Sequence, residues 1–229
     1  MADGLALLWL LVSWIAYTRI ADGSGASTRP MAQVLHGYRL TWMQRMLDRE
    51  NRMADVQIVA AYGRTGSLFA STTILIIAGV ITILGSVDKA REVISALSFA
   101  APASRELWEI KVMVLLAIFV YGFFQFAWCI RQFNYGLIMI GAAPLPAECL
   151  PSDRKAYPRR LAMLVARGIG TFNRGLRTYY FGLATLTWFI HPAFFALTIV
   201  GMLCVLYRRD FRSVTYRTLQ EADDGVDNA

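Results

Sequence analysis

The sequence predicts an all-α, polytopic membrane protein with about four transmembrane helices and amphipathic cytoplasmic helices. Long stretches without a charged residue occupy 65–87, 112–130 and 178–207, and a shorter one occupies 4–18. An uncharged, apolar stretch of about 18 residues or more is typical of a spanning helix. Charged residues make up only 17% of the chain, whereas soluble domains carry about 25%. We therefore expect one integral membrane domain over residues 1–213.

The first apolar stretch predicts a short span at about residues 4–20. It reaches about 22 Å as a helix, and Trp9, Trp14 and Tyr17 are residue types that anchor helices at the membrane surface. No basic residue precedes it, as one would in a signal peptide. We expect a short spanning helix, with a re-entrant or interfacial helix as the alternative.

The remaining stretches predict spans at 65–87, 110–131 and 178–207. The first two match the bilayer core of about 30 Å. The last reaches about 45 Å as a straight helix, which is long for one pass and short for two. Pro192 lies near its middle and removes a helical hydrogen bond. We predict one kinked, tilted helix, and two short passes are the alternative.

The distribution of arginine predicts the orientation. Arginine recurs in the segments 21–64 and 132–177, whereas acidic and basic residues are nearly balanced between the second and third spans. Basic loops accumulate on the cytoplasmic side, so both segments are predicted to be cytoplasmic in a cell (inner) membrane. Four passes then place both termini outside. The basic segment 207–212 disagrees with that placement.

Two segments outside the spans have helical patterns. Within 38–62, apolar residues recur at intervals of three and four residues, and no proline precedes the second span. This pattern predicts one long amphipathic helix that leads into the second span. This helix either contacts lipid headgroups or packs on its own domain. Residues 161–177 predict a helix with one apolar face and one basic face. The acidic tail at 214–229 is predicted to be disordered.

Several function classes have no support. The net charge of +7 comes from residues between apolar runs, which indicates headgroup contact rather than nucleic-acid binding. The three cysteines form no C-x-x-C motif, so no metal site is predicted. Catalytic motifs are absent from the sequence, and we expect no enzyme and no cofactor. His191 is the only histidine in an apolar run, which disfavours a two-histidine haem with His36.

Polar residues inside apolar runs are the nearest signal of a site, because they are costly in hydrocarbon. They recur on one side of the second, third and fourth spans, either as helix contact faces or as the lining of a polar cavity. Asp55, one turn after Asn51, either binds a cation or headgroup or caps a helix, and we favour the cap. The candidates for polar-interior or ligand contacts are Asp55, Arg64, Ser67, Ser71, Gln125, Arg131, Asn134, Arg177, Tyr180 and His191.

Five polar blocks resemble a membrane-protein family of bacteria and plants. These blocks are Asp55–Ile58, Arg64–Thr73, Arg131–Tyr135, Asn173–Phe181 and Leu206–Phe211. In this order they resemble the family known as domain of unknown function 599, over nearly the whole chain up to about Ser213. The resemblance implies a multi-pass membrane protein with four helices. It implies no activity and no site residues.

Two functions remain as expectations. The first is a homo-oligomeric membrane protein with a channel-like or small-ligand-binding polar interior. The second is a non-catalytic accessory or scaffolding subunit that binds lipid or a partner complex. Both imply contact with anionic lipid headgroups, and the second implies a partner protein.

Overall fold

The computed structural model describes residues 2–22, 31–211 and 218, and these residues form helices without a strand. The all-α prediction is therefore confirmed. The elements, in chain order, are α1 (Ala2–Ala21), α2 (Met31–Leu47), α3 (Met53–Gly85), α4 (Val87–Ser95), α5 (Arg105–Gly141), α6 (Pro151–Leu186), the 3-10 helix η1 (Thr187–Phe189) and α7 (Pro192–Phe211). The predicted tail at 214–229 lies outside the described residues, except for position 218.

Among the described residues, four helices are long and apolar enough to cross a membrane, namely α1, α3, α5 and α7. The sequence-based expectation of about four such helices is confirmed. The first three contain the expected spans 4–20, 65–87 and 110–131, apart from the last two residues of 65–87. The fourth, Pro192–Asp210, differs from the expected span.

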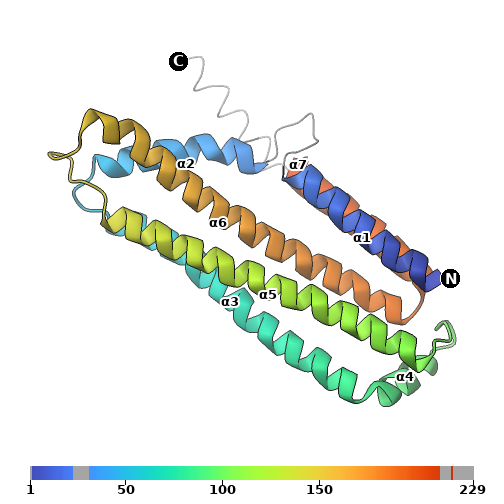
Figure 1. The fold of residues 1–229 in the computed structure, drawn as a ribbon. Coiled ribbons are helices and arrows are strands. Elements are labelled where there is room, and N and C mark those ends of the chain that lie inside the picture. Colours follow the sequence, from blue (N-terminus) through green and yellow to red (C-terminus); the bar gives the residue numbers. More distant parts are fainter. Residues whose placement is uncertain (1, 23–30, 212–217, 219–229) are drawn as a thin grey trace.

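The prediction of one kinked helix over 178–207 is wrong. α6 continues to Leu186, η1 follows, and α7 begins at Pro192, after which the chain runs back beside α6 (Figure 1). Proline suits the first turn of a helix, because its missing N–H needs no partner there. Nδ1 of His191 accepts a hydrogen bond from the Ala193 backbone N–H at 3.0 Å, which supports this new helix start. The division at Pro192 is the reason that the uncharged run is too long for one pass.

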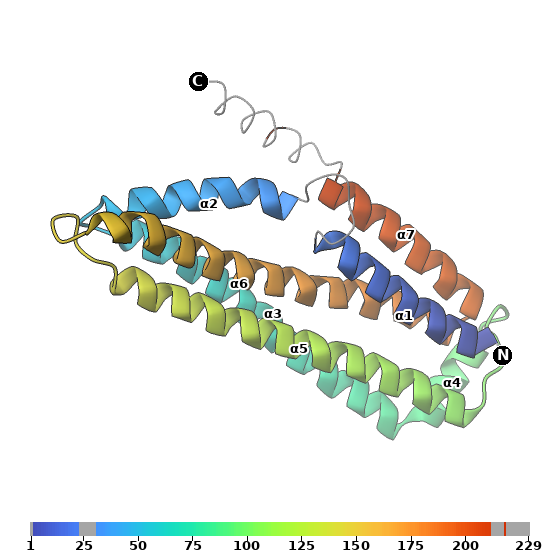
Figure 2. The same ribbon diagram turned by 45° about the horizontal axis from the view of Figure 1, so that its top comes forward.

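The long helices lie side by side along one axis. α5 packs between α3 and α6, and α1 and α7 pair on the other side of α6 (Figures 1 and 2). α6 runs the length of α5 in the opposite direction, so the described residues run along the bundle five times, in the four apolar helices and α6. α1 and α7 run in the same direction. The C-terminal end of α7 therefore points toward the end that holds α2, here called the α2 end.

The α2 end extends beyond α1 and α7. α3, α5 and α6 have 33, 37 and 36 residues, or about 50–55 Å each, whereas α1 and α7 have 20. α2 covers the extended part of α6 (Figure 2). The core there is apolar and includes Met43, Met46, Val59, Phe133 and Leu161. This part of the molecule is packed by its own side chains.

The predicted continuous helix over 38–62 is broken, and this expectation is wrong. α2 ends at Leu47 and α3 begins at Met53. The buried carboxylate of Asp55 accepts hydrogen bonds from Trp42 Nε1 and Arg49 Nη1, both at 2.7 Å, which joins α2 and the connecting segment to the first turn of α3. The Asn51 side chain accepts from the Met53 N–H at 3.0 Å at the start of α3.

A seven-residue repeat joins α5 to α6. Three glycines of α6 face three phenylalanines of α5, and a Cβ on any of these glycines would lie within 2.7 Å of a ring atom. Small residues let membrane helices approach closely. The pairs are Gly168 with Phe133, Gly175 with Phe126, and Gly182 with Phe119. The rings fill the space between α5 and α6 from Phe119 to Phe133.

Candidate functional site

Arg177 is a buried cation in the second half of α6, with 6% of its surface exposed. Its Nη2 donates a hydrogen bond to Oδ1 of Asp22 at 3.0 Å. Asp22 directly follows the last residue of α1. The guanidinium also lies over the ring of Tyr17, 5.8 Å from its centroid. A buried charge is costly unless it is paired, and Asp22 supplies part of that pairing.

Two nitrogens of the Arg177 guanidinium have no hydrogen-bond partner among the residues that the structure describes. These nitrogens, Nε and Nη1, are both buried. A buried donor without a partner costs about 1–3 kcal/mol. Each of these N–H groups therefore needs an oxygen acceptor, and carboxylate and phosphate oxygens are the acceptors that arginine binds most strongly.

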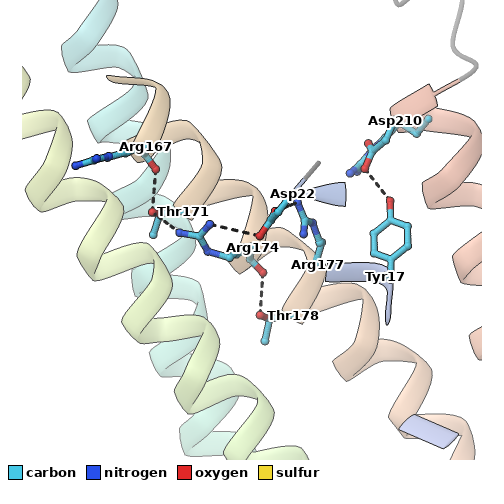
Figure 3. Close-up of polar contacts among 9 residues, drawn as sticks. Tyr17, Asp22, Arg167, Thr171, Arg174, Arg177, Thr178 and Asp210 are labelled. Carbon is cyan, nitrogen blue, oxygen red and sulfur yellow. Dashed lines mark hydrogen bonds and ion pairs between the residues drawn. The ribbon is translucent and has the colours of Figure 1, made fainter. Parts of the chain in front are cut away.

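Further polar groups of α6 lie beside Arg177 (Figure 3). Arg174 donates to Oγ1 of Thr171 at 3.0 Å and lies 3.7 Å from Oδ2 of Asp22. The Thr171 hydroxyl donates to the carbonyl of Arg167 at 2.9 Å and accepts from Nε2 of Gln132 at 3.3 Å. Thr171 is therefore saturated, and it holds Arg174 and Gln132 in place.

These side chains line one cavity of about 550 Å³ between α1, α2, α5 and α6, here called the Arg177 cavity. Three arginines line it, against one carboxylate in the described part of the chain, so its lining is positively charged. Trp128 of α5 lies at its edge and is exposed. The charged and polar lining includes Asp22, His36, Gln132, Arg167, Thr171, Asn173, Arg174 and Arg177.

A second polar chain connects α7 to the same region. Tyr17 donates to Oδ2 of Asp210 at 2.7 Å, as Figure 3 shows, and Asp210 also accepts from Nε of Arg209 at 2.9 Å. Nη1 of Arg209 donates to the hydroxyl of Tyr180 at 3.1 Å. Because the Tyr17 ring faces Arg177, the ends of α1 and α7 are fastened beside the Arg177 cavity.

Two of the residues proposed from sequence meet in this region. Arg177 lies in the cavity and Tyr180 in the adjoining polar chain. Gln125 of α5 is half-buried. Because Gly175 of α6 faces Phe126 of α5, Gln125 lies at about the same height along the bundle as Arg177.

The other residues proposed from sequence lie apart from the cavity. Ser67 and Ser71 are exposed on the outer face of α3, as is Arg64, and the Ser67 hydroxyl donates to the Gly63 carbonyl of its own helix at 3.1 Å. The regularly spaced polar residues Arg64, Ser67 and Ser71 of α3 therefore lie on its outer face. Two further candidates, Arg131 and Asn134, are exposed on α5.

Arg131, Asp55 and His191 each have a local role. Arg131 donates to the Tyr135 hydroxyl at 2.5 Å and lies over the Trp128 ring. Asp55 joins α2 to α3. His191 supports the start of α7 and does not line the Arg177 cavity, whereas His36 does.

Sequence reasoning missed Asp22, Thr171 and Arg174. Asp22 follows the first span by only a few residues, and Arg174 shares a seven-residue spacing with Arg167. The available signal was that spacing, which the sequence analysis interpreted as the polar face of a cytoplasmic helix. Another missed group is Lys111, which is 2% exposed and pairs with Asp3 at the opposite end of the bundle.

The sequence comparisons identify a family. A family model described as "Protein of unknown function, DUF599" matches residues 5–215. The chain therefore belongs to this family, in agreement with the resemblance of its polar blocks. Comparison with curated proteins and with solved structures gave no match.

Proposed function

We propose that this member of the DUF599 family is a non-catalytic membrane protein that binds an anionic ligand in the Arg177 cavity. The observation that carries the proposal is that two buried nitrogens of Arg177, Nε and Nη1, have no hydrogen-bond partner in the described ranges of the chain. Phosphate and carboxylate oxygens are the acceptors that a guanidinium binds most strongly, so an anion would supply the missing partners.

The charge of the lining supports an anion over other ligands. Asp22 offsets one positive charge, and its carboxylate already accepts from Arg177. Arg167 and Arg174 also line the cavity, so a ligand carrying one or two negative charges would bring it close to neutrality. A cation would meet mainly like charge.

We further propose that the α2 end faces the cytoplasm of the cell membrane. Basic residues concentrate there in the segments 21–64 and 132–177. With α6 as a fifth pass, the basic residues Arg208 and Arg209 at the end of α7 lie on the same side. The conflict that four passes created with the positive-inside rule therefore disappears. The first residues of α1 would lie outside.

A homo-oligomeric channel is a second candidate. Phenylalanine rings fill the α5–α6 interface, so a pore would have to form between copies. The exposed face of α3 with Arg64, Ser67 and Ser71 favours such contacts, and the same face would serve an accessory subunit that binds a partner protein. Ion flux through liposomes containing the purified protein tests the channel, and flux no greater than in empty vesicles would exclude it.

Anion binding is tested by the thermal stability of the purified chain in a neutral detergent. Inorganic phosphate and pyrophosphate should raise the unfolding temperature, because a ligand that binds the folded state stabilises it. Arg177→Gln should abolish the rise, whereas the exposed Arg159→Gln on the same helix should retain it. Equal responses of the two variants, or no response of the wild type, would refute the proposal.

A further inference from the structure

We infer that the ligand of the Arg177 cavity is a membrane lipid with an anionic phosphate headgroup, one acyl chain of which lies in a groove between α1 and α5. This inference rests on the proposed anion site. The new elements are the apolar groove and its position relative to the charged cavity.

The groove is an apolar cavity of about 470 Å³. Both of its walls belong to apolar runs that are long enough to cross a membrane. Such a surface suits a hydrocarbon chain, which gains about 0.8 kcal/mol for each CH₂ group removed from water but within a bilayer is held mainly by close packing. The lining includes Leu7, Leu11, Trp14, Val114, Ala117 and Ile118.

The groove and the Arg177 cavity follow the same face of α5. Ile118 and Tyr121 line the groove, and Trp128 and Gln132 line the cavity. Steps of three, seven and four residues keep these four side chains on one face of a helix. Tyr121 and Trp128 are about 10 Å apart along the axis, with Gln125 between them on that face.

α1 connects the two features in the same order. Residues 7–15 border the groove, and Ala21 and Asp22 border the cavity. A molecule lying along α1 toward its C-terminal end would pass from apolar to positively charged surroundings. A phospholipid has this arrangement of chain and headgroup, and a free phosphate does not.

The depth of the cavity also suits a headgroup. Arg19 and Asp22 end the apolar part of α1, so the cavity lies where lipid phosphates lie if the apolar runs fill the hydrocarbon. Trp128 is 53% exposed at its edge, and tryptophan is enriched at this level of a membrane. The volume of about 550 Å³ exceeds that of one phosphate and leaves room for the glycerol.

The test separates the contribution of the lipid headgroup from that of the acyl chain. Purified full-length protein in neutral detergent is titrated with phosphatidylglycerol, with glycerol phosphate as the chain-free probe and with phosphatidylcholine as the zwitterionic lipid. We expect phosphatidylglycerol to raise the unfolding temperature at about tenfold or more lower concentration than glycerol phosphate, and phosphatidylcholine to be weaker. Arg177→Gln should abolish both anionic responses.

A bulky substitution tests the groove directly. Ala117 is exposed in the groove, and Ala78 is exposed on α3, away from it. Ala117→Trp should bring the phosphatidylglycerol response down to that of glycerol phosphate, and Ala78→Trp should leave it unchanged. If Ala117→Trp does not fold, Ala117→Phe replaces it, and native mass spectrometry of the wild type counts retained phosphatidylglycerol against phosphatidylcholine.

The outcomes distinguish the two proposals. A response to glycerol phosphate that phosphatidylglycerol does not exceed would overturn the lipid inference and leave the anion site standing. Equal phosphatidylglycerol responses of the Ala117 variant and the wild type would also overturn the assignment of the groove. No response to any anionic probe would refute both proposals.

Discussion

The carboxylate of Asp22 occupies one side of the Arg177 guanidinium, with 3.0 Å between Oδ1 and Nη2. Its other oxygen lies 3.7 Å from Nη1 of Arg174. Asp22 is thus an internal anion that shares its two cations with any anionic ligand. The same carboxylate also fastens the end of α1 to α6, so it has opposite effects on stability and on binding.

Asp22→Asn is therefore expected to lower the stability of the unliganded protein and to tighten anion binding. The loss of a charged hydrogen bond should cost about 1–3 kcal/mol. Removal of the competing negative charge should lower the phosphate concentration needed for half-maximal stabilisation several-fold, by about 1 kcal/mol or more. Unfolding curves across a phosphate titration measure both effects.

The matched control for Asp22 is Asp48→Asn. Asp48 is an exposed carboxylate that pairs with Arg154 outside the cavity, so its removal should change neither quantity by much. Weaker phosphate binding in Asp22→Asn would mean that the carboxylate positions Arg177 for the ligand, which contradicts its role as a competitor.

Gly175→Ala is expected to destabilise the bundle. The new Cβ would lie 2.6 Å from Cε1 of Phe126, which packs tightly against α6, and overpacking of this kind costs about 1–3 kcal/mol. Gly79→Ala on α3 is the control, because a Cβ there meets no atom within 4 Å. Alanine should be neutral or stabilising at that position.

A double mutant tests the cause of the Gly175 effect. If the cost comes from the Phe126 ring, Gly175→Ala combined with Phe126→Leu should cost less than the sum of the two single changes. The free energy of unfolding in mixed micelles titrated with dodecyl sulfate measures each change. Strict additivity would show that the strain lies elsewhere.

The sequence predicts α1, α3 and α5 well because their uncharged runs reflect a single surrounding, the hydrocarbon. α6 does not have this property. Its first half is charged because it lies in the extension at the α2 end, and only its last residues, from Thr178, are uncharged. The uncharged end of α6 and the apolar α7 therefore form one uninterrupted apolar run in the sequence. For this reason the prediction from hydropathy did not include the turn before Pro192.

The site was less predictable than the fold because its geometry is tertiary. Arg177 and Asp22 are 155 residues apart in sequence, and no local pattern pairs them. The polar residues on α3 show the converse limit. The hydroxyls of Ser67 and Thr72 donate to carbonyls one turn earlier in their own helix, so such residues can lie on an outer face without a partner helix.

Reporter fusions should place the two termini on opposite sides of the membrane. Five passes require this arrangement, whereas four passes would place both termini on one side. A fluorescent protein that matures only in the cytoplasm should be bright when fused after residue 229 and dark when fused before residue 1. An alkaline phosphatase reporter, active only outside, should give the inverse pattern. Equal signals at both ends would contradict the fifth pass.

Lys111→Met should destabilise the end of the bundle opposite the cavity. Nζ of Lys111 lies 2.9 Å from Oδ1 of Asp3 and donates to the carbonyl of Trp188 at 3.0 Å. The indole N–H of Trp188 donates to the same Asp3 oxygen at 2.9 Å. The ammonium thus joins α1 to α5 and η1, and its side chain is 3% exposed.

The expected size of the effect follows from what the substitution leaves behind. Breaking a buried ion pair from one side costs about 3–5 kcal/mol, because the remaining charge stays desolvated. Asp3 is partly exposed, at 26% of its side chain, so the lower end of this range applies. Adding Asp3→Asn to Lys111→Met should recover part of the loss, since the orphaned carboxylate is then removed. Lys89→Met, an exposed lysine on α4, is the control. A cost no greater than that of the control would show that the Asp3 pair does not hold α1 in place.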